Sequence, residues 1–197
     1  MSNHQIELDW TNPYTFRELL SGDPQLRSEW DDKAGVYLHV EQSAERHELL
    51  YVGKATGRPS LWTRQVQHYT FLIGGQDCIP SRWRAESRPG WVMGYGKRTD
   101  PQTTQRTMST LFDVESFVGV VRDGFRFAAA HRIYLANVAD SALVRKLEAK
   151  LLHQLRPSMT GSQEVDPHPD LEIVHRGATW NVEPLRSRFR TPIHESP

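Results

Sequence analysis

The chain has 197 residues, a formal net charge of zero and a single cysteine. A chain of this length can bury a substantial hydrophobic core, and we expect residues 1–197 to form one domain. The lone Cys78 excludes an intramolecular disulfide and a thiolate-based structural zinc site, and it favours a reducing, cytoplasmic location. No apolar run approaches the roughly 18 residues of a membrane span, so no membrane partner is expected.

The N-terminal segment predicts one strand and one helix. "QIELDW" alternates like a short strand, and "NPYTFRELLSG" is typical of a helix. We expect Asn12 to cap that helix, with Pro13 at its first position and Gly22 as its stop. The stretch that follows, "GDPQLRSEWDDK", is acidic and rich in turn-forming residues.

A hairpin and a second helix come next. The runs "GVYLHVE" and "ELLYVGK" are β-branched and aromatic and flank the polar "QSAERH", which predicts two antiparallel strands. "RPSLWTRQVQHYTFLIGG" then predicts a helix with Ser60 as N-cap. Its apolar positions form one predicted buried stripe, namely Trp62, Val66, Tyr69 and Ile73. Arg64 and His68 lie four residues apart on the opposite side.

The second half of the chain begins with a segment that shows no period. Residues 76–108 are rich in Arg, Gly, Pro and Trp, and we interpret them as an irregular basic insertion. "STLFDVESFVGVVRDG" favours a helix over a pair of strands, and "HRIYLANV" predicts a strand. "DSALVRKLEAKLLHQLRP" predicts a helix that Asp140 caps and that ends before Pro157. "LEIVHRG" and "TWNVE" suggest a hairpin in the tail.

One carboxylate of the last helix stands out. At about 100° per residue, Glu148 falls within the half of the helix that carries the leucines, whereas Arg145, Lys146 and Lys150 lie on the polar side. A carboxylate against apolar neighbours is costly unless something pairs with it. A metal ion, an arginine or a position at the edge of a pocket would offset this cost. Alternatively, Glu148 lies at the rim of the core and reaches water.

Charge is unevenly distributed along the chain. Residues 1–48 carry four basic and ten acidic side chains, about −6, whereas residues 54–106 carry nine basic and three acidic ones, about +6. Such polarity is typical of a surface that faces a polyanion and is backed by an acidic side. The alternative is that the two segments form complementary faces within the protein.

Taken in order, these features resemble the GIY-YIG nuclease family. The resemblance consists of a "GVY" strand, a "YVG" strand, a helix with Arg and His four apart, a further strand, and a helix with an inward Glu followed by "LRP". The segment "GVYLHVEQSAERHELLYVGKA" is similar to the incision module of the bacterial excision-repair nuclease. The Arg-x-x-x-His spacing resembles that of the family's homing and restriction endonucleases. The resemblance covers residues 35–73 and 131–157.

The resemblance implies an α+β fold in which helices flank a small three-stranded antiparallel sheet. The core would comprise residues 34–75 and 131–157. Three further parts lie outside it: an N-terminal segment (1–33), a basic insertion (76–130) and a C-terminal extension (158–197).

Matching position by position, the resemblance also implies a role for each site residue. Tyr37 and Tyr51 would be the signature phenols, Arg64 the phosphate-binding cation, and Glu148 the ligand of Mg²⁺ or Mn²⁺, with Lys54 and His68 auxiliary. Glu148 would then face the two phenols across the sheet, and nearby cations would make a phenolate easier to form, with Tyr37 favoured as the base. Thr160 stands where the family often has Asn.

The implied function is a divalent-metal-dependent DNA endonuclease of restriction, mobile-element or repair type. Basic side chains of the insertion would contact DNA phosphates beside its aromatic residues, namely Arg82, Arg84, Arg88, Lys97 and Arg98. Because one catalytic centre cuts one strand at a time, cleavage of both strands calls for a homodimer or for two successive binding events. The alternatives are a nucleic-acid-binding module that has lost cleavage and a structural α/β domain in which the tyrosines and Glu148 belong to the core.

Overall fold

The structure is a computed structural model, and it describes residues 4–43, 47–74, 79, 83, 114–159 and 165–177. The chain divides into two compact units. The first comprises Met1–Thr63 and Arg132–Pro197, and the second comprises Arg64–His131. Within the described ranges, no helix has the length and apolar character that crossing a membrane requires.

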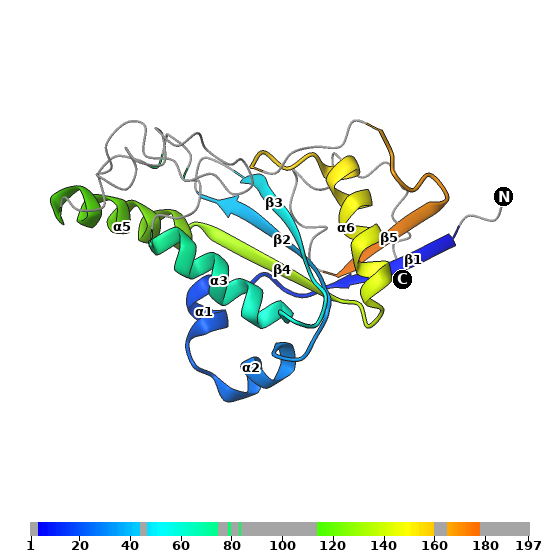
Figure 1. Cartoon of the computed structure of the whole chain (residues 1–197), viewed down its shortest axis with the longest axis horizontal. Coiled ribbons are helices and arrows are strands. Elements are labelled where there is room, and N and C mark those ends of the chain that lie inside the picture. The colour runs from blue at the N-terminus through cyan, green and yellow to red at the C-terminus, as the bar shows by residue number, and fades with distance from the viewer. Residues whose placement is uncertain are drawn as a thin grey trace. The chain divides into compact units, whose positions relative to one another are not determined.

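The first unit contains the predicted sheet. Its strands are β2 (Gly35–Gln42), β3 (His47–Ala55) and β4 (His131–Asn137), in the order β3-β2-β4 (Figure 1). The sheet is antiparallel, which confirms the predicted α+β class with a three-stranded antiparallel sheet. β4 runs so close to the start of β2 that a Cβ atom at Gly35 would lie 2.0 Å from the carbonyl oxygen of Ala136. A glycine is therefore required at this position.

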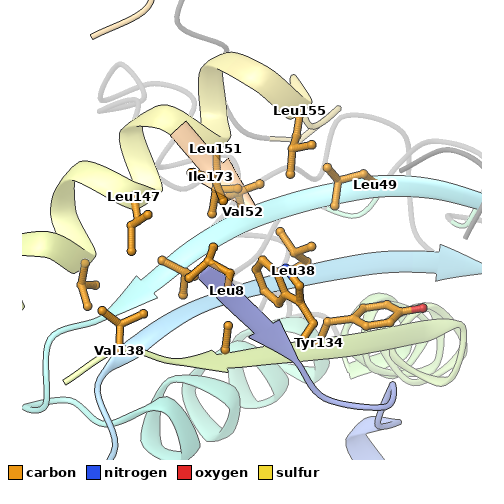
Figure 2. Packing of buried hydrophobic residues seen from close by; sticks show 14 of the residues in the cluster. Leu8, Leu38, Leu49, Val52, Tyr134, Val138, Leu147, Leu151, Leu155 and Ile173 are labelled. Carbon is orange, nitrogen blue, oxygen red and sulfur yellow. The ribbon is translucent and has the colours of Figure 1, made fainter. Parts of the chain in front are cut away.

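Helix α6 (Ser141–Leu155) covers one face of this sheet, as the hydrophobic pattern predicts. Asp140 caps it by accepting hydrogen bonds from the backbone N–H groups of Ala142 and Leu143, at 2.8 and 3.3 Å. Leu147, Leu151 and Leu155 are fully buried and point at the sheet (Figure 2). They share one core with Leu38 and Val52. Burying a side chain of this size contributes about 1.5–3 kcal/mol each.

A second, two-stranded sheet pairs the first and last described strands of the chain. β1 (His4–Trp10) pairs in parallel with β5 (Leu171–Gly177). Residues of both strands belong to the α6 core (Figure 2), notably Leu8 and Ile173. "LEIVHRG" is thus the predicted strand, but its described partner is β1, and "TWNVE" lies outside the described residues. The pairing contributes Leu8 and Trp10 of β1 and Leu171 and Ile173 of β5 to the core.

The N-terminal helices differ from the prediction. Helix α1 (Phe16–Leu20) begins three residues later than expected because Thr15, not Asn12, is its cap. Thr15 and Glu18 form a reciprocal capping box. The backbone of Tyr14 instead bridges to Ile133 of β4.

The acidic, turn-rich stretch after α1 is partly helical. It contains helix α2 (Pro24–Trp30), which begins with proline at its first turn. Asp23 caps α2 by accepting the N–H of Gln25 at 2.9 Å. Trp30, at the end of α2, is buried. A turn-forming Asp-Pro pair therefore starts a helix here.

Most of α3 (Leu61–Ile73) lies in the second unit together with α5 (Val114–Ala129), which confirms two predicted helices. The predicted buried stripe of α3 is wrong. The buried positions are Leu61, Gln65, His68 and Leu72, whereas Trp62, Val66, Tyr69 and Ile73 are only partly covered. Packing partners select this face: α5 runs so close that a Cβ at Gly124 would lie 2.3 Å from the Leu72 carbonyl oxygen.

Candidate functional site

The two signature tyrosines form a stacked pair on one face of the hairpin. Tyr37 pairs across the strands with Gly53, and His39 pairs with Tyr51. The ring centroids of Tyr37 and Tyr51 are 5.9 Å apart, with 20° between the ring planes. A Cβ atom at Gly53 would lie 2.3 Å from Cζ of Tyr37 and 2.5 Å from Cε1 of Tyr51. The glycine of "YVG" therefore makes room for both phenol rings.

His39 completes this aromatic cluster, and the sequence interpretation missed it. Its ring centroid lies 5.4 Å from Tyr37 and 5.8 Å from Tyr51, and the edge of Phe16 in α1 packs against it at 5.5 Å. The signal was available, because His39 follows Tyr37 by two residues in a strand and must share its face. Tyr37 and His39 are buried, whereas Tyr51 is partly exposed. Tyr51 is therefore the phenol of this cluster that reaches the surface.

Glu148 of α6 forms an ion pair with Lys54 of β3. The Lys54 ammonium donates to one carboxylate oxygen of Glu148. The side chain of Glu148 is 17% exposed and that of Lys54 is 35% exposed, so the pair lies at the rim of the core. The carboxylate in the apolar arc of α6 thus has a partner, and that partner is a lysine from a strand distant in the sequence.

The ion pair and the phenols lie on opposite faces of the hairpin. Side chains alternate along a strand, so Lys54 points away from the face of Gly53 and its two rings. Val36, the cross-strand partner of Lys54, belongs to the α6 core, which places the ion pair on the α6 side. The expected approach of Glu148 to the phenols across one face is therefore not observed.

One member of each group, Tyr51 and Lys54, nevertheless lies on the same edge strand of the sheet. β3 is an outer strand of the three, and Tyr51 and Lys54 are about 10 Å apart along it, at roughly 3.3 Å per residue. The first half of this edge is covered, because the N–H groups of Ser158 and Met159 donate to the carbonyls of Leu49 and Leu50 at 3.0 and 2.8 Å. The second half carries the candidate residues, on the two faces that meet at this edge.

The remaining predicted residues belong to the second unit or lie outside the described ranges. Arg64 donates to the side-chain oxygen of Gln67 at 3.0 Å. His68 lies on the buried face of α3, not on the polar face that we expected. Outside the described residues lie Arg82, Arg84, Arg88, Lys97, Arg98 and Thr160.

The donor set around Glu148 determines what metal could bind there. In the described ranges, no three or more His, Cys, Asp or Glu side chains gather closely enough to hold a metal ion. Glu148 alone offers one partly exposed carboxylate, which Lys54 already contacts. Mg²⁺ is often held by only one or two carboxylates together with water and substrate phosphate. The site therefore fits Mg²⁺ or Mn²⁺ only as an ion that a bound phosphate helps to hold.

No protein-family model, curated protein or solved structure gives a significant match to this chain. Membership of the GIY-YIG family therefore stays a prediction from the sequence. In the structure, Gly53 of the "YVG" motif pairs across the strands with Tyr37 of the "GVY" motif.

Proposed function

We propose that the chain is a divalent-metal-dependent DNA endonuclease of the GIY-YIG type, with its active site along the second half of β3. The observation that carries this proposal is the stacking of Tyr37 and Tyr51 over Gly53 on one face of the hairpin, with the Lys54–Glu148 pair on the other face next to the same part of β3. A phenol and an ammonium group on the edge strand β3, together with a carboxylate from α6, are groups that phosphodiester hydrolysis can use for proton transfer and charge stabilisation.

We assign the proton acceptor role to Tyr51. Tyr51 is partly exposed and can meet water, whereas Tyr37 is fully buried. Tyr37 and His39 then act as positioning residues, because their rings pack against Tyr51 and fix its orientation. This assignment replaces the preference for Tyr37 as the base.

Glu148 would hold the divalent cation and Lys54 would hold a phosphate oxygen. A bound Mg²⁺ or Mn²⁺ supplies charge stabilisation to the phosphate and the departing oxygen. Lys54 would orient the Glu148 carboxylate before substrate binds and would then exchange this partner for the phosphate. Arg64 would be a further phosphate-binding cation, with His68 auxiliary to it.

The proposed partner is DNA, bound by the basic insertion in a reducing cytoplasm. The net charge of about +6 over residues 54–106 supports this partner. Replacing Arg82, Arg84 and Arg88 together by alanine should weaken duplex binding and flatten its dependence on salt concentration. Unchanged affinity at moderate salt would remove the insertion from the interface. A homodimer would supply the two centres that a double-strand break requires.

A non-catalytic nucleic-acid-binding module is the second candidate. It is favoured by the contact that Glu148 already makes with Lys54, and by the complete burial of Tyr37, as in an ordinary core. This module would bind the same DNA with the same salt dependence but would leave it intact.

Nicking of supercoiled plasmid in Mg²⁺ or Mn²⁺ separates these functions. We expect wild type to nick, and Glu148→Gln and Tyr51→Phe to lose at least about 100-fold in rate. Glu172→Gln on β5 controls for the loss of a partly buried carboxylate, and Tyr134→Phe controls for the loss of a core hydroxyl. Binding without nicking by wild type supports the second candidate. Nicking that survives both site substitutions contradicts the assigned active site.

A further inference from the structure

The carboxylate that we propose as the metal ligand already has a cation beside it. Lys54 of β3 donates to a carboxylate oxygen of Glu148 in α6. The two residues are far apart in the sequence, so only the folded chain brings their charges together. In the part of the chain that the structure describes, Glu148 belongs to no group of three or more His, Cys, Asp or Glu side chains that could hold a metal ion. The Lys54 ammonium therefore balances its charge.

A second ion pair of α6 shows how a lysine is held when it cannot leave. Two residues after Glu148, the Lys150 ammonium donates to Asp166 at 2.5 Å and to the His168 carbonyl oxygen at 3.0 Å. The side chain of Lys150 is 7% exposed, whereas that of Lys54 is 35% exposed. Separating Lys150 from its acceptors would leave a buried charge without a partner, which is costly. Lys54 can leave Glu148 and still be hydrated.

A divalent cation and the Lys54 ammonium would compete for the same carboxylate. Mg²⁺ binds carboxylate oxygens at about 2.1 Å, so a cation on Glu148 would lie close to an ammonium that contacts the same group. Like charges at such short separations repel, and they do so more strongly where water is partly excluded. The side chain of Glu148 is only 17% exposed. Metal binding to Glu148 would therefore require Lys54 to move away.

We propose that Lys54 competes with the divalent cation for Glu148 and so keeps metal from this site in the free protein. This inference rests on the proposed function, because it concerns the same metal site. On that function, a DNA phosphate that binds the ammonium would free the carboxylate. DNA and metal would then bind cooperatively, and each would raise the affinity for the other by the same factor. The protein would take up its metal together with its substrate.

Manganese binding by the full-length chain, without DNA, tests this competition. Bound Mn²⁺ broadens the NMR signals of nearby amides, and the amides of Glu148 and Ala149 are the reporters. In Lys54→Met, the Mn²⁺ concentration that broadens them should be at least about fivefold lower than in wild type, which corresponds to the strength of a partly exposed ion pair. Lys54→Arg keeps the positive charge and should behave like wild type. Lys146→Met removes an exposed charge from the same helix and is the matched control.

A gain in Lys54→Met that disappears in the Lys54→Met/Glu148→Gln double variant supports the proposal. Wild type that binds Mn²⁺ as tightly as Lys54→Met, or an equal gain in Lys54→Arg or Lys146→Met, would overturn it. Far-UV circular dichroism checks folding, and Lys54→Gln replaces Lys54→Met if that variant does not fold. Plasmid nicking is read separately. The gain without nicking by wild type would contradict only the nuclease function, whereas nicking without the gain would contradict only the competition.

Discussion

Gly53 is the position at which the geometry of the tyrosine pair is most easily perturbed. An alanine methyl group there would lie 2.3 Å from Cζ and 2.5 Å from Oη of Tyr37, and 2.5 Å from Cε1 of Tyr51. Carbon atoms in contact prefer separations of about 3.5–4.0 Å, so the rings must move by more than an ångström. Tyr37 is fully buried and has little room to do so.

The magnitude follows from two opposing effects. Overpacking a core by one methyl group typically costs about 1–3 kcal/mol. Replacing a strand glycine by alanine raises the free energy of unfolding by roughly 0.5–1 kcal/mol, because the unfolded chain loses conformational freedom. The middle values of the two ranges differ by about 1 kcal/mol, so we expect Gly53→Ala to lower the free energy of unfolding by about that amount and the Tm by roughly 2–4 °C for a chain of this size.

Urea unfolding followed by intrinsic fluorescence measures this loss. The same substitution should cost at least about 1 kcal/mol less in a Tyr37→Leu background, because the shorter side chain removes the closest atoms. In a Tyr37→Phe background the loss should persist, since Cζ remains. A Gly53→Ala variant as stable as wild type, or a loss that Tyr37→Leu does not reduce, would refute the proposed packing.

Two further predictions concern pH. Burial lowers the pKa of His175 to about 3, so below about pH 6.5 the unfolded chain takes up a proton that the folded chain does not. As the pH falls below about 6.5, the free energy of unfolding should therefore decrease by up to about 1.4 kcal/mol per pH unit, and His175→Gln should remove this slope in urea unfolding. Burial raises the pKa of Asp166, but hydrogen bonds from Lys150 and the His168 N–H, with nearby positive charge, lower it by more. Asp166 therefore stabilises the fold at neutral pH, and this contribution declines as the pH falls below about 4 toward the lower pKa of the folded state. Asp166→Asn should cost about 1–3 kcal/mol at pH 7 and flatten this acid loss.

Local sequence signals predicted the central strands and α6 because each signal acts within a few residues. The β-branched runs around "QSAERH" specify the hairpin, and Asp140 specifies the start of α6. The capping box of Thr15 and Glu18 was equally local, but the Asn-Pro pair before it suggested an earlier start. Helix α1 begins after Tyr14 because the backbone of Tyr14 bridges to Ile133 of β4, more than 100 residues away in the sequence.

Features that depend on distant partners could not be predicted. Glu148 in the apolar arc correctly indicated a paired carboxylate, but nothing local identified Lys54 as its partner. Lys150 was expected on the polar side of α6, yet it is 5% exposed because Asp166 and the His168 carbonyl bind it at 2.5 and 3.0 Å. The parallel pairing of β1 with β5 joins the two chain ends and has no short-range signature.

The most direct test of the proposed active site is a double-mutant cycle on Lys54 and Glu148, read as single-turnover cleavage of plasmid DNA in Mg²⁺. If the pair acts as a unit, Lys54→Met and Glu148→Gln should each lower the rate by at least about 100-fold, and the double variant should lose little more than either alone. Wild-type protein that binds DNA but leaves it uncut, or a Glu148→Gln variant that cleaves at the wild-type rate, would contradict the account.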